Sequence, residues 1–133
     1  MKRVINILMV DDVEFSRELL RSAVLASIND ESLSIDPQFF HVANGKSIIE
    51  IIKNKGIHIV YLDIDLPDEN GLELLKGIKK IFAGVTVVMV SGEGSSENVM
   101  QAIKNGANGF IVKPFNTARI HETLRNYLNK GES

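Results

Sequence analysis

Short runs of β-branched and other apolar residues alternate five times along the chain with longer stretches whose apolar residues recur at helical spacing. The apolar runs span residues 4–10, 39–43, 57–62, 86–90 and 109–112, and the longer stretches span about 13–26, 44–56, 71–82, 96–106 and 117–129. Such alternation is typical of parallel strands joined by right-handed helical crossovers. Near-continuous apolar strands also indicate a sheet that is covered on both faces. The sequence therefore predicts an α/β fold with a doubly wound, five-stranded parallel sheet and five helices, arranged as a three-layer αβα sandwich.

The connection between the first predicted helix and the second predicted strand is unusually long. It covers residues 27–38, whereas helix-to-strand loops in such folds usually have about 2–6 residues. This connection lies at the opposite edge of the sheet from the carboxyl ends of the strands. We interpret residues 27–38 as an inserted surface loop without a chemical role, with contact to a partner protein as the alternative.

Composition limits the classes of function that this chain can have. With 133 residues and 44% hydrophobic content, we expect one domain over residues 1–133, with one core and no output domain. The net charge of −2 and the absence of a basic run argue against direct binding to nucleic acid. The chain has no cysteine, so it can form neither a disulfide nor a thiolate metal site. No window holds the roughly 20 apolar residues that membrane insertion requires, and we expect a cytoplasmic protein.

Polar residues suited to chemistry follow four of the five predicted strands. Asp11 and Asp12 follow the first strand, Asp63 the third, Ser91 the fourth and Lys113 the fifth. Each residue alone has an ordinary structural explanation, such as a helix cap, a turn or a surface charge. The carboxyl ends of parallel strands share one edge of the sheet, however, and ligand sites of α/β folds lie at that edge. The five residues together therefore predict one functional site.

The residue types at this edge indicate phosphoryl chemistry assisted by a metal ion. Three clustered carboxylates repel one another unless a hard cation lies among them, and oxygen ligands suit Mg²⁺. Such a cation would leave Asp63 to attack phosphorus and carry an aspartyl phosphate. Lys113 and Ser91 suit the remaining phosphoryl oxygens, and Gly92 allows the backbone to approach the ligand. The chain has no glycine-rich nucleotide loop, so the sequence gives no support for binding of ATP or NAD.

These residues resemble the receiver domain of two-component response regulators, in particular the single-domain chemotaxis regulators, over residues 4 to about 128. The spacings Asp63-x-x-x-Pro67 and Lys113-Pro114-Phe115 also match that family. The resemblance implies a flavodoxin-like fold, a Mg²⁺ cofactor and a cis peptide bond before Pro114. It also implies the following roles: Asp63 as the phosphoacceptor; Asp11, Asp12, Asp63 and the backbone carbonyl of Asp65 as metal ligands; and Ser91, Gly92, Phe110 and Lys113 as the phosphate-binding and switch residues.

At three positions this chain departs from the family pattern or has one particular residue among those that the family allows. The aromatic switch position is Phe110, which has no hydroxyl group and also suits a plain core role. The positions two residues beyond the phosphoacceptor and two beyond the switch hydroxyl are the acidic Asp65 and Glu93. We expect both to tune the lifetime of the phosphorylated state through water access and metal affinity, in a direction that the sequence leaves open.

The resemblance implies a signalling switch rather than an enzyme in the ordinary sense, although receivers catalyse their own phosphoryl transfer and autodephosphorylation. A histidine kinase or a histidine phosphotransfer protein would phosphorylate Asp63. A downstream protein target would then bind the face formed by the fourth helix, the fifth strand and the fifth helix, at residues 96–129. Both a terminal effector and a phosphoryl relay stay open, as do a monomer and a weak phosphorylation-dependent dimer.

Two alternatives use the same residues differently. Asp63 and Asp65 resemble the nucleophile and acid of haloacid-dehalogenase-type phosphatases, but that family has this pair near the start of the chain and a further acidic pair late. In this chain the acidic pair comes first. The second alternative is a degenerate receiver that binds partners without phosphorylation, which the complete set of five site residues disfavours.

Overall fold

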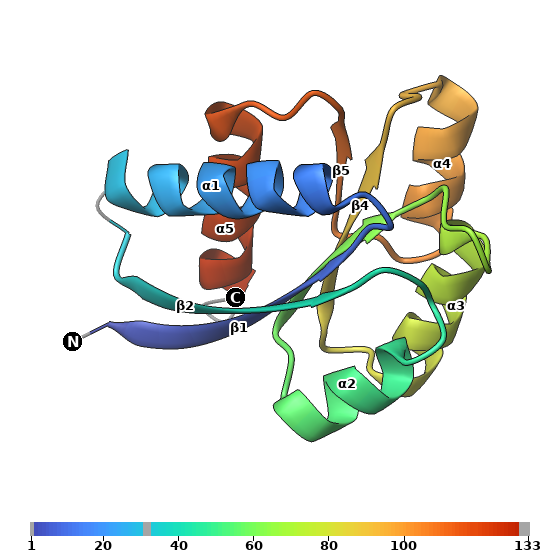
Figure 1. The fold of residues 1–133 in the computed structure, drawn as a ribbon, viewed down its shortest axis with the longest axis horizontal. Helices are drawn as coiled ribbons and strands as arrows, with labels where there is room; N and C mark the ends of the chain where they lie inside the picture. Colours follow the sequence, from blue (N-terminus) through green and yellow to red (C-terminus); the bar gives the residue numbers. More distant parts are fainter. Residues whose placement is uncertain (1, 31–32, 131–133) are drawn as a thin grey trace.

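Five parallel strands form one sheet in the computed structural model, which describes residues 2–30 and 33–130 (Figure 1). The strand order is β2-β1-β3-β4-β5, so β2 lies on one side of β1, and β3, β4 and β5 follow in turn on the other side. In chain order the elements are β1 (Arg3–Val10), α1 (Glu14–Asp30), β2 (Ile35–Val42), α2 (Ile48–Lys55), β3 (Ile59–Asp63), α3 (Gly71–Ile81), β4 (Thr86–Ser91), α4 (Ser96–Lys104), β5 (Gly109–Val112) and α5 (Thr117–Asn129).

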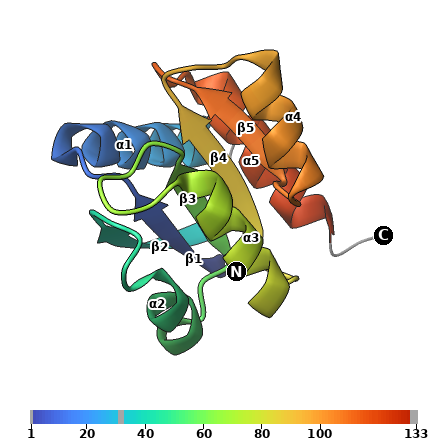
Figure 2. The same ribbon diagram turned by 90° about the vertical axis from the view of Figure 1, so that its right-hand side faces the viewer.

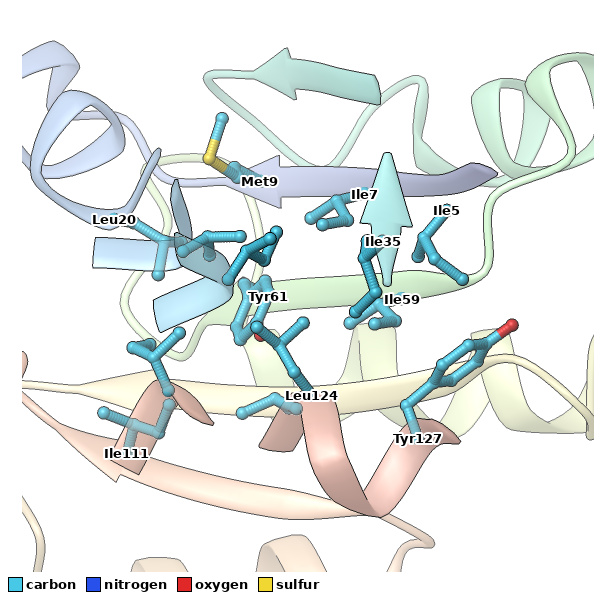
Figure 3. Packing of buried hydrophobic residues seen from close by; sticks show 14 of the residues in the cluster. Ile5, Ile7, Met9, Leu20, Ile35, Ile59, Tyr61, Ile111, Leu124 and Tyr127 are labelled. Carbon is cyan, nitrogen blue, oxygen red and sulfur yellow. The ribbon is translucent and has the colours of Figure 1, made fainter. Parts of the chain in front are cut away.

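Helices cover both faces of this sheet. Figures 1 and 2 show α1 and α5 together on one face, with α2, α3 and α4 on the other. The strands divide their side chains between two cores with a period of two: Ile59 and Tyr61 pack beneath α1 and α5 (Figure 3), and Val60 and Leu62 pack beneath the other three helices. The Tyr61 hydroxyl lies 2.8 Å from Thr123 Oγ1 and ties β3 to α5. The predicted three-layer αβα sandwich is confirmed.

The predicted surface loop over residues 27–38 is wrong. Helix α1 continues to Asp30 and strand β2 begins at Ile35, so only residues 31–34 connect the two elements. Of these four, residues 31 and 32 lie outside the described residues. The connection therefore has an ordinary length and leaves no insertion to act as a partner-binding segment.

Position in the fold explains why Ser27 does not end α1 and Pro37 does not end β2. Ser27 and Ile28 lie on the buried side of the last turns of α1, and the core there overrides their weak helix preference. The carbonyls of Ser34, just before β2, and of Val42, its last residue, accept hydrogen bonds from the β1 side, so the backbone groups of even-numbered residues of β2 face β1. Pro37 faces the open edge of the sheet, where its missing N–H breaks no ladder bond.

The other predicted boundaries differ from the structure by a few residues. Helix α2 begins at Ile48, because the Asn44 side chain accepts a hydrogen bond from the Lys46 N–H and closes a turn instead of capping the helix. The helix ends as predicted at Gly56, whose φ of 58° suits glycine. Within residues 2–30 and 33–130, no helix combines the length and the apolarity needed to cross a membrane.

Candidate functional site

The predicted polar residues meet at one edge of the sheet, where β1, β3, β4 and β5 end. Lys113 Nζ lies 2.9 Å from Asp11 Oδ2 and 3.1 Å from Asp63 Oδ2, although 102 and 50 positions separate these residues in the chain. One carboxylate oxygen from each of Asp11, Asp12 and Asp63 lies within 4.8 Å of the others. Ser91 is the last residue of β4, the strand beside β3. The topology therefore assembles the predicted acids and lysine into one cluster.

Asp63 ends the buried strand β3 and is itself only 5% exposed. Its Oδ1 accepts a hydrogen bond of 3.0 Å from the Asp65 N–H, and its Oδ2 accepts one from Lys113. Burial raises the pKa of Asp63 and the nearby Asp11 charge adds to this effect, against the opposing influence of the Asp65 N–H and Lys113. Additional positive charge at the site would therefore favour the ionised, nucleophilic form of this carboxylate.

Lys113 is a fixed cation at the centre of the cluster. Burial opposes its charged form, but hydrogen bonds and attraction to Asp11 and Asp63 raise the pKa of Lys113 above its usual value. The ammonium group is thus held protonated between two carboxylates. The Lys113–Pro114 peptide bond is cis, as the family resemblance implies.

The three carboxylates form a donor set that fits a magnesium ion. Asp11 and Asp63 are buried, whereas Asp12 is exposed on the solvent side of the cluster. Lys113 offsets one of the three negative charges, which leaves an excess that a divalent cation would balance. Oxygen ligands open to water on one side suit Mg²⁺, which keeps several of its own waters. The Asp65 backbone carbonyl as a further ligand stays a prediction.

Ser91 and Gly92 lie at the site but make no hydrogen bond to the acids in this structure. The Ser91 side chain is fully buried, and its Oγ accepts a hydrogen bond of 3.0 Å from the Glu93 N–H. A Cβ at Gly92 would meet no atom within 4 Å, so the space beside its backbone is open. Asp65 and Glu93 are both exposed. Because Oγ only accepts in this contact, the hydroxyl proton can still be donated to a phosphoryl oxygen.

Phe110 lies on β5 and packs inward. Its side chain is 9% exposed and belongs to the core beneath α2, α3 and α4. Its carbonyl oxygen accepts a hydrogen bond of 3.0 Å from Arg119 Nη2 on α5. In this structure the residue thus has the plain core role that the sequence also allowed.

Gly71 is a positioning residue that the sequence patterns did not single out. It is the first residue of α3, and its N–H donates a hydrogen bond of 2.8 Å to the Ile64 carbonyl. A Cβ at this position would lie 2.6 Å from Ile64 Cα and would overlap the carbonyl oxygen of Asp63. Only glycine lets α3 begin so close to the end of β3. The Asn70-Gly71 pair is a turn signal in the sequence. The close contact of Gly71 with Asp63 and Ile64 cannot be read from the sequence.

Comparisons with known proteins agree with this geometry. Residues 7–125 match the model of the response regulator receiver domain family. The chemotaxis protein CheY of Bacillus subtilis is 34% identical over 124 residues, which cover 93% of this chain and 98% of the relative. The chemotaxis protein CheY of Halobacterium salinarum is 33% identical over 123 residues, which cover 92% and 96%.

Solved structures show the same fold. A CheY-like response regulator receiver domain protein from Methanospirillum hungatei superposes with a TM-score of 0.74 and 28% identity, covering 98% of both chains. The signal receiver domain of a putative LuxO repressor protein from Vibrio parahaemolyticus gives a TM-score of 0.79 and 25% identity, covering 98% of this chain and 94% of the other. The sequence relatives and the solved structures thus both match receiver proteins over almost the whole chain.

Proposed function

Because the chain belongs to the response regulator receiver domain family and is similar to its CheY-type members, we propose that it is a phosphorylation-controlled switch whose phosphoacceptor is Asp63. The family consists of signalling switches rather than ordinary enzymes. The observation that carries the proposal is the pair of contacts from Lys113 to Asp11 and Asp63 within a cluster of three carboxylates. These contacts support the proposal because they bring together the residues proposed as nucleophile, metal ligands and phosphate-binding cation.

The proposed reaction moves a phosphoryl group from a partner histidine to Asp63. A carboxylate oxygen of Asp63 attacks phosphorus in line, an O–P bond forms, and the N–P bond to the imidazole breaks. When bound by Asp11, Asp12 and Asp63, Mg²⁺ would offset the repulsion between the carboxylates and the incoming oxygens. Lys113 holds a second phosphoryl oxygen with its ammonium group. A histidine kinase or a histidine phosphotransfer protein is the proposed donor.

Phosphorylation of Asp63 would change the conformation of the neighbouring strands β4 and β5. The Ser91 hydroxyl would donate its proton to a phosphoryl oxygen. The backbone of Ser91 is already joined to β5, because its carbonyl accepts a hydrogen bond of 2.8 Å from the Lys113 N–H. A shift of β5 would alter the packing of Phe110 beside α4. The proposed outcome is a population shift of the α4–β5–α5 face.

The α4–β5–α5 face has the composition of a protein-binding surface. Figure 2 shows α4 and β5 side by side at the end of the sheet. Met100 and Ile103 on α4 are 69% and 64% exposed, and Val112 at the end of β5 is 46% exposed. Large apolar side chains so open to water favour binding of a partner. We propose that the downstream protein target binds here, whether it is a terminal effector or a relay histidine protein.

The phosphatase alternative with Asp63 and Asp65 is not favoured. Asp65 approaches Asp63 through its backbone N–H, and the Asp65 side chain is exposed. We propose instead that Asp65 and Glu93 adjust the lifetime of the phosphoryl group from the rim of the site. Both acids would act on the water that hydrolyses the acyl phosphate.

Intact-mass measurement after incubation with acetyl phosphate tests the proposal. Wild type with Mg²⁺ should gain one phosphoryl group, whereas Asp63→Asn with Mg²⁺ and wild type with chelator should gain none. The Asp63→Asn variant is a matched control, because it keeps the volume of the side chain. Equal phosphorylation of wild type and Asp63→Asn would overturn the proposal.

A further inference from the structure

Arg17 reaches back from the first turns of α1 to the acidic turn. Its Nη1 donates a hydrogen bond of 2.5 Å to the backbone carbonyl of Asp11. That oxygen belongs to the planar peptide group that joins Asp11 to Asp12. Fixing this oxygen therefore fixes the direction in which the chain leaves Asp11 and enters Asp12.

The other polar groups of Asp11 are bound as well. Its N–H donates a hydrogen bond of 3.2 Å to the Val42 carbonyl, and its Oδ1 accepts one of 2.9 Å from the Val13 N–H. Its Oδ2 accepts the hydrogen bond from Lys113. Asp12, in contrast, is exposed and follows this anchored residue directly. The placement of the Asp12 carboxylate thus depends on the peptide group that Arg17 holds.

We propose that Arg17 is a positioning residue for the metal site: its guanidinium group fixes the Asp11–Asp12 peptide and so aligns the Asp12 carboxylate with those of Asp11 and Asp63 for a divalent cation. This inference rests on the proposed Mg²⁺ site. Groups that orient metal ligands from outside the ligand set typically change metal affinity by about 10–100-fold when they are removed.

A pure charge effect of Arg17 would have the opposite sign. A guanidinium group beside three carboxylates repels a second cation, so removing its charge alone would strengthen Mg²⁺ binding. Removing a positioning contact weakens Mg²⁺ binding. The direction of the change therefore separates the two roles without any assumption about its size.

Arg21 supplies a matched control on the same helix. Its guanidinium carbon lies 5.2 Å from the centre of the Phe39 ring, where it makes a cation–π contact away from the acidic turn. Arg17 and Arg21 line the same groove between α1 and β2. Arg21→Met therefore removes one positive charge from the same groove but leaves the contact with the Asp11–Asp12 peptide in place.

The test is direct calorimetric titration of the metal-free protein with MgCl₂, for wild type, Arg17→Met, Arg17→Gln and Arg21→Met. We expect both Arg17 variants to bind Mg²⁺ about tenfold more weakly than wild type, with Arg21→Met unchanged. Amide NMR shifts in the metal-free state provide a second measurement: those of Asp12 and Val13 should move in the Arg17 variants and stay in place in Arg21→Met. Arg17→Gln keeps a polar side chain on the helix, so it carries the test if Arg17→Met does not fold.

Two outcomes would overturn the inference. One is equal or tighter Mg²⁺ binding by folded Arg17 variants, and the other is an equal loss of affinity in Arg21→Met. Failure of the proposed function is distinguishable, because wild type would then bind no Mg²⁺ or would accept no phosphoryl group on Asp63. A wild type that binds Mg²⁺ beside Arg17 variants that bind it equally well removes only the positioning role.

Discussion

Replacement of Gly71 by alanine should destabilise the protein through a clash at the end of β3. The added Cβ would lie 2.6 Å from Ile64 Cα and would overlap the Asp63 carbonyl oxygen, whereas ordinary contacts at a Cβ begin near 3.4 Å. Both neighbours are backbone atoms, so no side chain can rotate away. Overpacking of this kind typically costs about 1–3 kcal/mol of unfolding free energy, and the rigid neighbours place this case near about 2 kcal/mol.

Gly77 provides the matched control within the same helix. It lies in the middle of α3, and a Cβ there would meet no atom within 4 Å. Gly77→Ala should therefore stabilise the protein by about 0.5–1 kcal/mol, because alanine loses less backbone entropy in a helix. The same chemical change, six positions apart on one helix, is predicted to have opposite signs.

Thermal unfolding followed by far-UV circular dichroism measures both effects. For a domain of this size, we expect the midpoint to fall by roughly 6–10 °C in Gly71→Ala and to rise by roughly 2–4 °C in Gly77→Ala. Phosphorylation by acetyl phosphate should also slow in Gly71→Ala, since Asp63 itself must shift. A Gly71→Ala variant as stable as Gly77→Ala would refute the close approach of α3 to β3.

Three further results are expected. The Ser27 hydroxyl is fully buried and finds no hydrogen-bond partner among the described residues. Ser27→Ala should therefore raise the unfolding free energy by about 1 kcal/mol in a urea titration. A loss of stability would contradict the lack of a partner. Burial, with the charges of Arg3 and Lys130, lowers the pKa of His58. The neutral ring therefore contributes stability that is complete above its unfolded pKa of about 6.5 and is lost as the pH falls below that value. The thermal midpoint of His58→Asn, whose side chain can still accept the Asn6 N–H, should therefore fall less than that of wild type between pH 7.5 and pH 5, and parallel curves would rule this effect out. Finally, Asp65→Asn and Glu93→Gln should change the decay rate of the phosphorylated protein, and unchanged decay in both would remove their proposed role at the rim.

The pattern of apolar residues was sufficient to predict the architecture, because strand and helix periods differ and the central strands β3 and β4 are buried along their whole length. The junction between α1 and β2 was mispredicted for a physical reason. Ser27 and Pro37 resemble loop residues in sequence, but one is buried in a helix and the other lies on an edge strand. Position in the tertiary structure decides both cases, and local preference does not reveal it.

At the site, too, the sequence predicted what the topology determines but not the individual side-chain contacts. Asp11, Asp63 and Lys113 could be predicted as neighbours, because parallel topology brings strand ends together whatever the loops do. The contact between Arg17 and the Asp11 carbonyl could not, since a charged side chain on a helix has many partners within reach. The orientation of the Ser91 hydroxyl toward its own turn was equally hidden, because a serine side chain has several rotamers of similar energy.

The central claim is that Asp63, and no other acid of the cluster, receives the phosphoryl group. Borohydride reduction converts an aspartyl phosphate to homoserine, which tandem mass spectrometry locates in the sequence. After incubation with acetyl phosphate and Mg²⁺, homoserine is expected at position 63 alone. Homoserine at position 11, 12 or 65, or its absence from a protein that has gained a phosphoryl group, would contradict the assignment.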